Sequence, residues 1–226
     1  NVSGIIPASG LAVDWFKDLV GRAGEAGDEA FADVGEVTPG SRGLLFLPHL
    51  AGERFRLCRP DTRGAFIGLT ARHTRKEMAR AVVEALAFAV REILQTMAAN
   101  DLEVADLRVT GGQARDAILN QIKADVTGVE VRVPAVIDAE LVGGTAVAYT
   151  ALGEYSNLVE ASEALVRMDR SYTPRAEAKE LYDELFDLYR ASAAGLEGVF
   201  ARLARITGIT RRRDSACSSP RCSGSC

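Results

Sequence analysis

The stretch from Leu107 to Pro134 constrains the fold more than any other part of the sequence, and it reads LRVTGGQARDAILNQIKADVTGVEVRVP. Its first residues, up to Thr110, predict a β-strand, because side chains branched at Cβ pack well on a pleated sheet. The pair Gly111 and Gly112 follows, and glycine lets another backbone or a ligand approach more closely than a residue with a Cβ allows. The stretch therefore begins with a strand that runs into a glycine turn.

A helix and a second strand complete this stretch. Asp116 can cap the helix, whose apolar residues recur along one face at Ile118, Leu119, Ile122 and Val126. Gly128 stands where helices commonly end, and Val129–Val133 predicts the next strand. A strand, a glycine turn and a helix start can form a nucleotide site, because free N–H groups at a helix N-terminus attract anions. The same glycine pair is also compatible with a tight turn that binds nothing.

Other segments have the patterns of shorter elements. Strands are predicted at Leu44–Leu47, where Pro48 ends the ladder, and at Ala65–Leu69. A capping box of Thr74 and Glu77 opens a long helix with apolar residues from Met78 to Met97, and His73 before it is interpreted as a turn residue. Further helices are predicted at Leu11–Val20, with Leu11, Trp15, Phe16 and Leu19 on one side, within Gly21–Ser41, at Ala139–Tyr155, and after Pro174, with Leu181, Leu185 and Leu188 on one face.

Two features within these segments leave alternatives open. Gly143 and Gly144 lie inside a predicted helix, where each costs ~1 kcal/mol relative to alanine, so we expect close packing or a nearby ligand to compensate. Arginines and acids crowd the segment from Glu53 to Arg63. This segment is either a solvated loop with internal ion pairs or a loop facing a cleft, where arginine can bind phosphate or carboxylate.

Composition places the chain among ordinary globular proteins. Its 226 residues are 47% hydrophobic and 26% charged, and no apolar run approaches the ~20 residues of a membrane helix. The net charge of −4 gives no electrostatic reason to expect nucleic acid as a partner. Four cysteines, three of them among the last ten residues, form no disulfide framework, and two histidines argue against a zinc site. We therefore expect a cytoplasmic protein without a metal site of its own.

The two ends differ from the rest. The sequence begins abruptly without methionine, which favours a piece cut from a longer protein. Residues 206–226, with Arg211–Arg213 and a serine- and cysteine-rich end, contain no periodic apolar residues, so we expect a disordered tail after a domain spanning 1–205. We interpret this tail as a cloning remnant or a misread frame rather than a nucleic-acid arm.

Four ordered segments together resemble the C-terminal half of the FGGY carbohydrate kinases, the family that includes xylulokinase, gluconate kinase and glycerol kinase. They are LLFLPHLAGER (Leu44–Arg54), DTRGAFIGLT (Asp61–Thr70), TGGQARDAILNQIKADVTG (Thr110–Gly128) and AELVGGTAVAYTALGEY (Ala139–Tyr155). The opening ASGLAVDW (Ala8–Trp15) is similar to the segment that precedes them in the family. The resemblance implies an α/β fold, an actin-like ATPase (ribonuclease H-like) domain in which a mixed sheet is flanked by helices.

The resemblance also implies site residues. Those that match positions around the nucleotide of the family are Gly10, Asp14, Gly111, Gly112, Gln113 and Asp116. Many members have a third glycine where this chain has Gln113, and Thr-Pro where it has Phe55-Arg56, so the sugar subgroup stays open. The family's general base is an aspartate upstream of the matched segments, so no residue of this chain is assigned a catalytic role.

The function expected from the resemblance is that of the nucleotide-binding half of an ATP-dependent sugar kinase that uses ATP and Mg²⁺. Its expected partners are a ketose or polyol, the N-terminal half of the same kinase, and a second copy in a homodimer, with neither nucleic acid nor membrane. A non-catalytic nucleotide-sensing module on the same fold and an unrelated glycine-rich α/β binding domain are the alternatives. This fragment alone is expected to be inactive, because it lacks the base and the first phosphate-binding loop.

Overall fold

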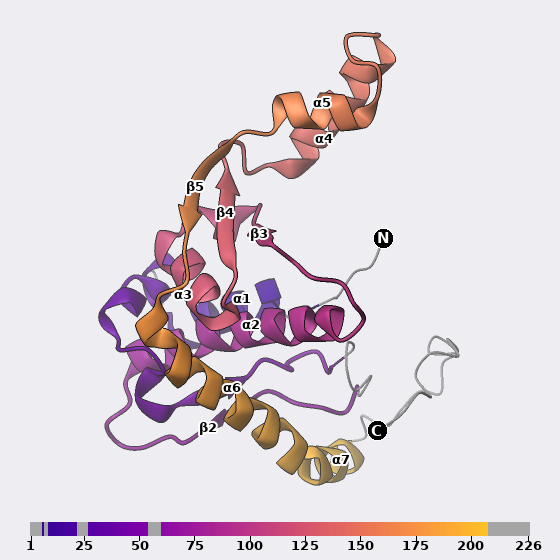
Figure 1. Cartoon of the computed structure of the whole chain (residues 1–226). Helices are drawn as coiled ribbons and strands as arrows, with labels where there is room; N and C mark the ends of the chain where they lie inside the picture. Colours follow the sequence, from indigo (N-terminus) through magenta and orange to yellow (C-terminus); the bar gives the residue numbers. More distant parts are fainter. Residues whose placement is uncertain (1–5, 7–8, 22–26, 54–59, 208–226) are drawn as a thin grey trace.

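A computed structural model describes residues 6, 9–21, 27–53 and 60–207 of the chain. Within these ranges the α-helices are α1 (Ser9–Val20), α2 (Arg75–Ala98), α3 (Ala117–Thr127), α4 (Ala139–Ala151), α5 (Leu158–Leu165), α6 (Ala176–Gly195) and α7 (Glu197–Ile206) (Figure 1). The strands are β1 (Leu45–Leu47), β2 (Ala65–Ile67), β3 (Asp106–Arg108), β4 (Glu130–Pro134) and β5 (Met168–Tyr172). Short 3-10 helices lie at η1 (Gly27–Phe31), η2 (Val34–Glu36), η3 (Ser41–Gly43) and η4 (Gly112–Arg115).

The strands form two separate sheets. β1 pairs antiparallel with β2, with Leu45 opposite Ile67. β3 pairs parallel with β4, and β4 pairs antiparallel with β5, so the second sheet is mixed and has the order β3–β4–β5. Helix α3 packs against β4 and β5, and α2 packs in turn against α3. This arrangement confirms the predicted α/β class with a mixed sheet flanked by helices.

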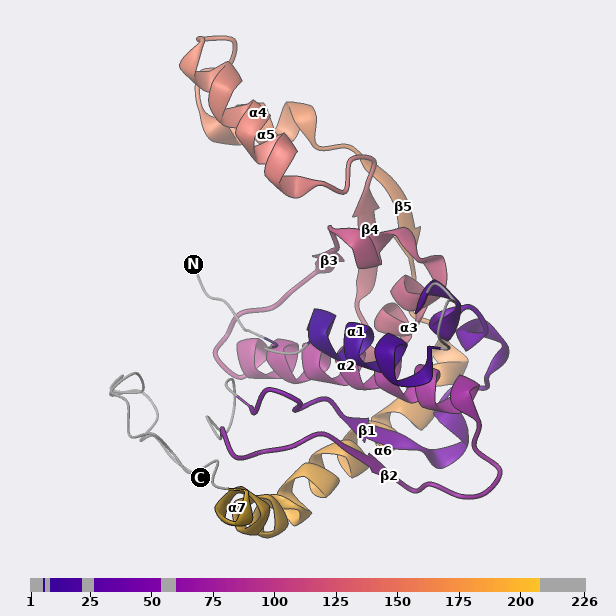
Figure 2. The same ribbon diagram turned by 180° about the vertical axis from the view of Figure 1, so that it is seen from behind.

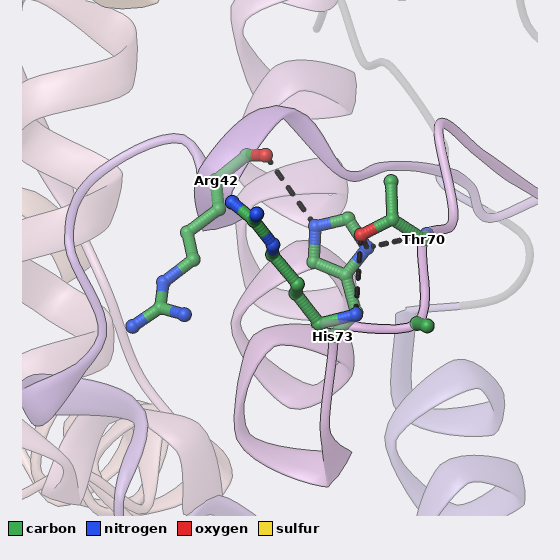
Figure 3. A pocket seen from close by; sticks show the side chains of 5 residues that line it. Arg42, Thr70 and His73 are labelled. Atoms are coloured by element: carbon green, nitrogen blue, oxygen red, sulfur yellow. Dashed lines mark hydrogen bonds between the residues drawn. The ribbon is translucent and has the colours of Figure 1, made fainter.

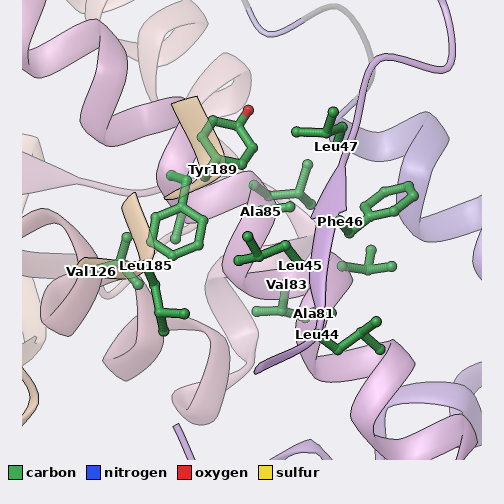
Figure 4. Close-up of a cluster of buried hydrophobic side chains, with 14 of the residues drawn as sticks. Leu44, Leu45, Phe46, Leu47, Ala81, Val83, Ala85, Val126, Leu185 and Tyr189 are labelled. Atoms are coloured by element: carbon green, nitrogen blue, oxygen red, sulfur yellow. The ribbon is translucent and has the colours of Figure 1, made fainter. Parts of the chain in front are cut away.

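The long helix α2 forms the centre of the core. Every residue from Ala81 to Phe88 is buried, because α1, α3 and β1 contact α2 on different sides. β1 is buried along its whole length, and Figure 4 shows its side chains gathered with those of α2 and α6. The ring of Phe88 meets Tyr189 of α6 at 5.4 Å between centroids, which joins the two helices through aromatic contact.

The local signals at the helix ends are confirmed. Thr74 and Glu77 form both hydrogen bonds of a capping box at the start of α2. Asp116 caps α3, and Gly128 ends it with φ of 71°, a left-handed conformation that glycine adopts without strain. These ends follow from side chains only a few residues away, which is why the sequence predicts them.

Helix α1 buries a different face from the predicted one. Ala12 and Phe16 are buried, whereas Leu11 and Leu19 are exposed. Aromatic packing sets this rotation, because Phe16 meets Phe31 at 5.5 Å and the adjacent Trp15 stacks on Phe46 of β1. The prediction that Leu11 and Leu19 share the buried face was therefore wrong.

Three further elements differ in detail from their predictions. The helix predicted within Gly21–Ser41 is replaced, in the described part, by the 3-10 helices η1 and η2 and the start of η3. In α6 the large buried side chains are Tyr182, Leu185, Phe186 and Tyr189, whereas Leu181 and Leu188 are exposed. β3 ends at Arg108, before the glycine turn, and η4 separates the turn from α3.

Helices α4 and α5 form an arm that extends from one end of the sheet (Figures 1 and 2). The two helices pack against each other, and the chain enters the arm from β4 and returns through β5. Apart from Ala146 and Ala161, these helices bury none of their residues.

Some predictions lie beyond the described residues. The segment from 54 to 59 and the tail from 208 onward are outside them. Helix α7 ends at Ile206, and the division of the chain at residue 205 stays a prediction.

Candidate functional site

The glycine turn is held between β3 and the segment that leads into the arm. Gly111 has φ of 79° and ψ of −173°, a conformation that favours glycine. Its N–H donates to the carbonyl of Ile137 at 2.9 Å, and its own carbonyl accepts from the N–H of Ala114 at 3.1 Å. These two hydrogen bonds fix the backbone of the turn on both sides of Gly111.

The space in front of the turn is open. A Cβ added at Gly111 or at Gly112 would meet no atom within 4 Å. The described part of the chain thus gives no packing reason for Gly112, whereas Gly111 is explained by its backbone angles. An exposed glycine surrounded by open space fits a flat group that approaches the backbone from outside.

The start of α3 is already occupied by a carboxylate. Oδ1 of Asp116 accepts hydrogen bonds from the N–H groups of Ile118 at 2.8 Å and Leu119 at 3.2 Å. A phosphate at this helix end would find those donors used and would meet a negative charge. The predicted Asp116 cap is therefore present, and of the two possibilities left open for this stretch it disfavours an anion bound at the start of α3.

Asn120 of α3 holds η4 in place behind the turn, and the sequence analysis did not identify it as a site residue. Its side chain is fully buried, and Nδ2 donates to the carbonyl of Ala114 in η4 at 2.9 Å. Its Oδ1 has no hydrogen-bond partner among the described residues. The sequence does contain a signal of this role, because Asn120 is a polar residue between the apolar residues Leu119 and Ile122 of a predicted helix.

The remaining candidate residues fall into two places. Gln113 lies half-buried in η4, where its carbonyl accepts from the N–H of Asp116 at 3.3 Å. Gly10 and Asp14 lie on the exposed side of α1, and a Cβ at Gly10 would also meet open space. The structure thus brings Gly111, Gly112, Gln113 and Asp116 together within one turn, and Gly10 and Asp14 lie on a separate element, α1.

A hollow of about 690 Å³ lies at the start of α2 (Figure 3). Nδ1 of His73 accepts from the backbone N–H of Thr70 at 2.9 Å, and Nε2 lies 3.4 Å from the carbonyl of Arg42. Both ring nitrogens therefore face backbone groups, which agrees with a turn residue that joins η3 to α2.

The charged segment from Glu53 to Arg63 is described only at its two ends. There, Nη1 of Arg63 donates to the carbonyls of Pro60 and Thr62, both at 3.0 Å.

Neither a metal cluster nor a membrane helix is found in the part of the chain that the structure describes. No group of three or more His, Cys, Asp or Glu side chains there could hold a metal ion. No helix there is long and apolar enough to cross a membrane.

Residues 2–152 match the family model described as "FGGY family of carbohydrate kinases, C-terminal domain". This range includes α1 and the whole glycine turn. The chain belongs to the FGGY family of carbohydrate kinases. Its α/β architecture is accordingly that of the actin-like ATPase fold, as the resemblance implied.

Curated relatives and solved structures of FGGY kinases agree with this assignment. Xylulose kinase of Staphylococcus epidermidis is 28% identical over 204 residues, which cover 90% of this chain and 41% of that protein. Glycerol kinase of Shewanella woodyi is 32% identical over 187 residues, covering 82% of this chain and 37% of that protein. The chain thus spans about two fifths of the length of these relatives.

Two solved structures match with similar extents. Gluconate kinase from Lactobacillus acidophilus superposes with a TM-score of 0.76 at 27% identity, over 86% of this chain and 39% of that one. Xylulose kinase from Rhodospirillum rubrum superposes with a TM-score of 0.74 at 30% identity, over 85% of this chain and 39% of that one. The similarity covers most of the described residues of this FGGY domain.

Proposed function

We propose that this chain is the C-terminal, nucleotide-binding part of an ATP-dependent kinase that phosphorylates a ketose or a related polyol. Relatives named xylulose, glycerol and gluconate kinases support the class of substrate. The observation that carries the proposal for this chain is the open space in front of Gly111 and Gly112, within the range matched by the family.

The turn's chemistry fits the nucleoside part of ATP. Gly112 exposes its backbone, Asn120 fixes η4 behind it, and the Asp116 carboxylate keeps phosphate away from the start of α3. The phosphates would therefore extend away from α3, toward residues outside this turn. ATP with Mg²⁺ supplies the transferred γ-phosphoryl group, and such chemistry depends on positioning and charge neutralisation. No carboxylate of this chain is assigned as the base that takes the sugar hydroxyl's proton.

The partners follow from this role. In this proposal the sugar contacts and the general base come from the rest of the kinase. The match covers only 41% of a xylulose kinase, so a larger part of such a protein lies outside it. A cytoplasmic location supplies ATP and suits a chain whose four cysteines form no disulfide framework. Neither nucleic acid nor membrane is expected as a partner, and a homodimer stays a prediction.

The test is Gly112→Val in the full-length kinase, with Gly198→Val on α7 as a matched control. Both glycines lie in helical turns where an added Cβ meets no atom within 4 Å, so the two substitutions are comparable within this chain. The valine at 112 should weaken ATP binding much more than sugar binding, because it fills the space that a nucleoside needs. Unchanged ATP affinity rejects the site, and equal loss of ATP and sugar binding leaves it without support.

A further inference from the structure

The hollow at the start of α2 is lined by basic and uncharged residues. Of the described residues, Arg42, Thr70, Ala71, Arg72 and His73 line it, and none of these is acidic. Its volume of about 690 Å³ lies within the range of ~300–1,000 Å³ that is typical of small-molecule sites. None of these residues belongs to α1 or to the glycine turn, so the hollow is separate from the proposed nucleotide site.

Arg42 reaches the hollow from a turn that residues with a Cβ disfavour. All residues from Gly40 to Gly43 have positive φ, which is 49° at Ser41 and 55° at Arg42. A left-handed backbone is unfavourable at both of these positions, so the turn needs support from elsewhere. Glu84 provides it, because its carboxylate accepts from the N–H of Gly40 and the hydroxyl of Ser41, both at 2.9 Å. The core therefore holds the backbone of Arg42 at the hollow in spite of the strain.

His73 fixes the shape of the hollow. Its Nδ1 accepts from the N–H of Thr70, and its Nε2 lies 3.4 Å from the carbonyl of Arg42 (Figure 3). The N–H of Arg72 donates to the hydroxyl of Thr70 at 3.3 Å. These contacts engage only the backbone of the two arginines, so they position both residues and leave both guanidinium groups for other partners.

The two guanidinium groups have few partners within the described residues. The side chain of Arg42 is 60% exposed, and its Nε lies 3.6 Å from Oε1 of Glu77. An ion pair with one exposed partner contributes little to stability. The other oxygen of Glu77 accepts from the N–H and hydroxyl of Thr74 at 2.8 and 2.6 Å, so this carboxylate mainly serves the capping box. For the guanidinium of Arg72, the described part of the chain provides neither a hydrogen bond nor an ion pair.

We propose that this hollow binds the phosphate group of a phosphorylated small molecule between Arg42 and Arg72. A guanidinium group presents paired N–H donors that match phosphate oxygens, and it stays charged at physiological pH. The hollow is larger than a phosphate ion requires, so it also has room for the organic part of a phosphate ester. The N–H groups at the start of α2 are not needed, because Thr74 and Glu77 already cap that helix.

The test is isothermal titration calorimetry of the full-length protein with ribose 5-phosphate, ribose and inorganic phosphate. Arg42→Gln and Arg72→Gln should each weaken the binding of ribose 5-phosphate at least ~10-fold, because each removes a charge-assisted contact. Binding of ribose, which has no phosphate, should be the same in both variants as in the wild type. Arg75→Gln is the matched control, since Arg75 is an exposed arginine at the start of α2 that does not line the hollow.

Folding is controlled separately, and each outcome decides the proposal. Both arginines are exposed, so the far-UV circular dichroism of the variants should match that of the wild type. Unchanged binding of ribose 5-phosphate in a variant that lacks both arginines would place the ligand elsewhere and overturn the proposal, as would an absence of binding to the wild type. An equal loss in Arg75→Gln would attribute the effect to general positive charge and would also overturn it.

The inorganic phosphate arm distinguishes the two sources of the same chemistry. Tighter binding of ribose 5-phosphate than of inorganic phosphate supports a phosphate ester as the ligand. Equal binding of the two, lost in both variants, would support the phosphate site and assign it to the free ion. None of these measurements depends on turnover, so this inference is tested independently of the proposed function.

Discussion

Replacing Glu84 by glutamine tests the buried polar network that joins α2, α6 and η3. Oε1 of Glu84 accepts from Arg80 Nε at 2.8 Å, Tyr182 Oη at 2.9 Å and the N–H of Gly40 at 2.9 Å, while Oε2 accepts from Ser41 Oγ at 2.9 Å. The side chains of Arg80 and Glu84 are only 4% and 3% exposed. The same carboxylate holds Ser41, which has the unfavourable φ of 49°. One side chain thus fixes two helices and a strained turn.

The magnitude follows from what glutamine retains. Its carbonyl oxygen can keep the three bonds at Oε1, and the hydroxyl of Ser41 can rotate to accept from the new amide. The main change is the lost charge opposite Arg80, and removing one partner of a buried ion pair costs ~3–5 kcal/mol. Two carbonyls, of Val34 and Val37, still accept from Arg80 at 3.1 and 2.7 Å. We therefore expect the lower end, a loss of ~3 kcal/mol in the free energy of unfolding.

Urea unfolding of the full chain measures this loss. Glu180→Gln, the same substitution at an exposed position on α6, is the control. The control should change stability by less than ~0.5 kcal/mol. Tyr182→Phe removes one donor to Glu84 and one acceptor for Arg80, so it should cost ~1–3 kcal/mol. A loss below ~1 kcal/mol for Glu84→Gln would show that the charge of Arg80 needs no buried partner, and the reasoning would fail.

Two further predictions concern pH and activity. Hydrogen bonds from the side chain and backbone of Thr74 lower the pKa of Glu77 from 4.5 to about 2, so this carboxylate contributes stability above pH 4.5 that is lost as the pH falls toward 2. Glu77→Gln should flatten this part of the curve of unfolding free energy against pH, and an unchanged curve contradicts the assignment. The chain alone should show no sugar-dependent ADP release, because the proposed function places the general base outside this chain and losing such a base alone costs ~10²–10⁴ in rate. Turnover by the isolated chain would place a base within these residues.

The parts of the fold that the sequence predicted are those set by near neighbours along the chain. The capping box at Thr74, the Asp116 cap and the left-handed Gly128 each depend on groups within four residues. The rotation of α1 could not be predicted in this way. It depends on Phe31 and on Phe46 of β1, and these contacts form only when distant segments meet.

The candidate site was predictable in position but not in chemistry. The glycine pair after a β-branched run predicted the turn at Gly111 and Gly112, and Asp116 before the apolar periodicity was predicted to cap the helix. Periodicity could not show that η4 would separate the turn from α3, because a four-residue 3-10 helix leaves no periodic pattern. It also could not show that Asn120 is fully buried under the turn, since burial depends on how α3 packs.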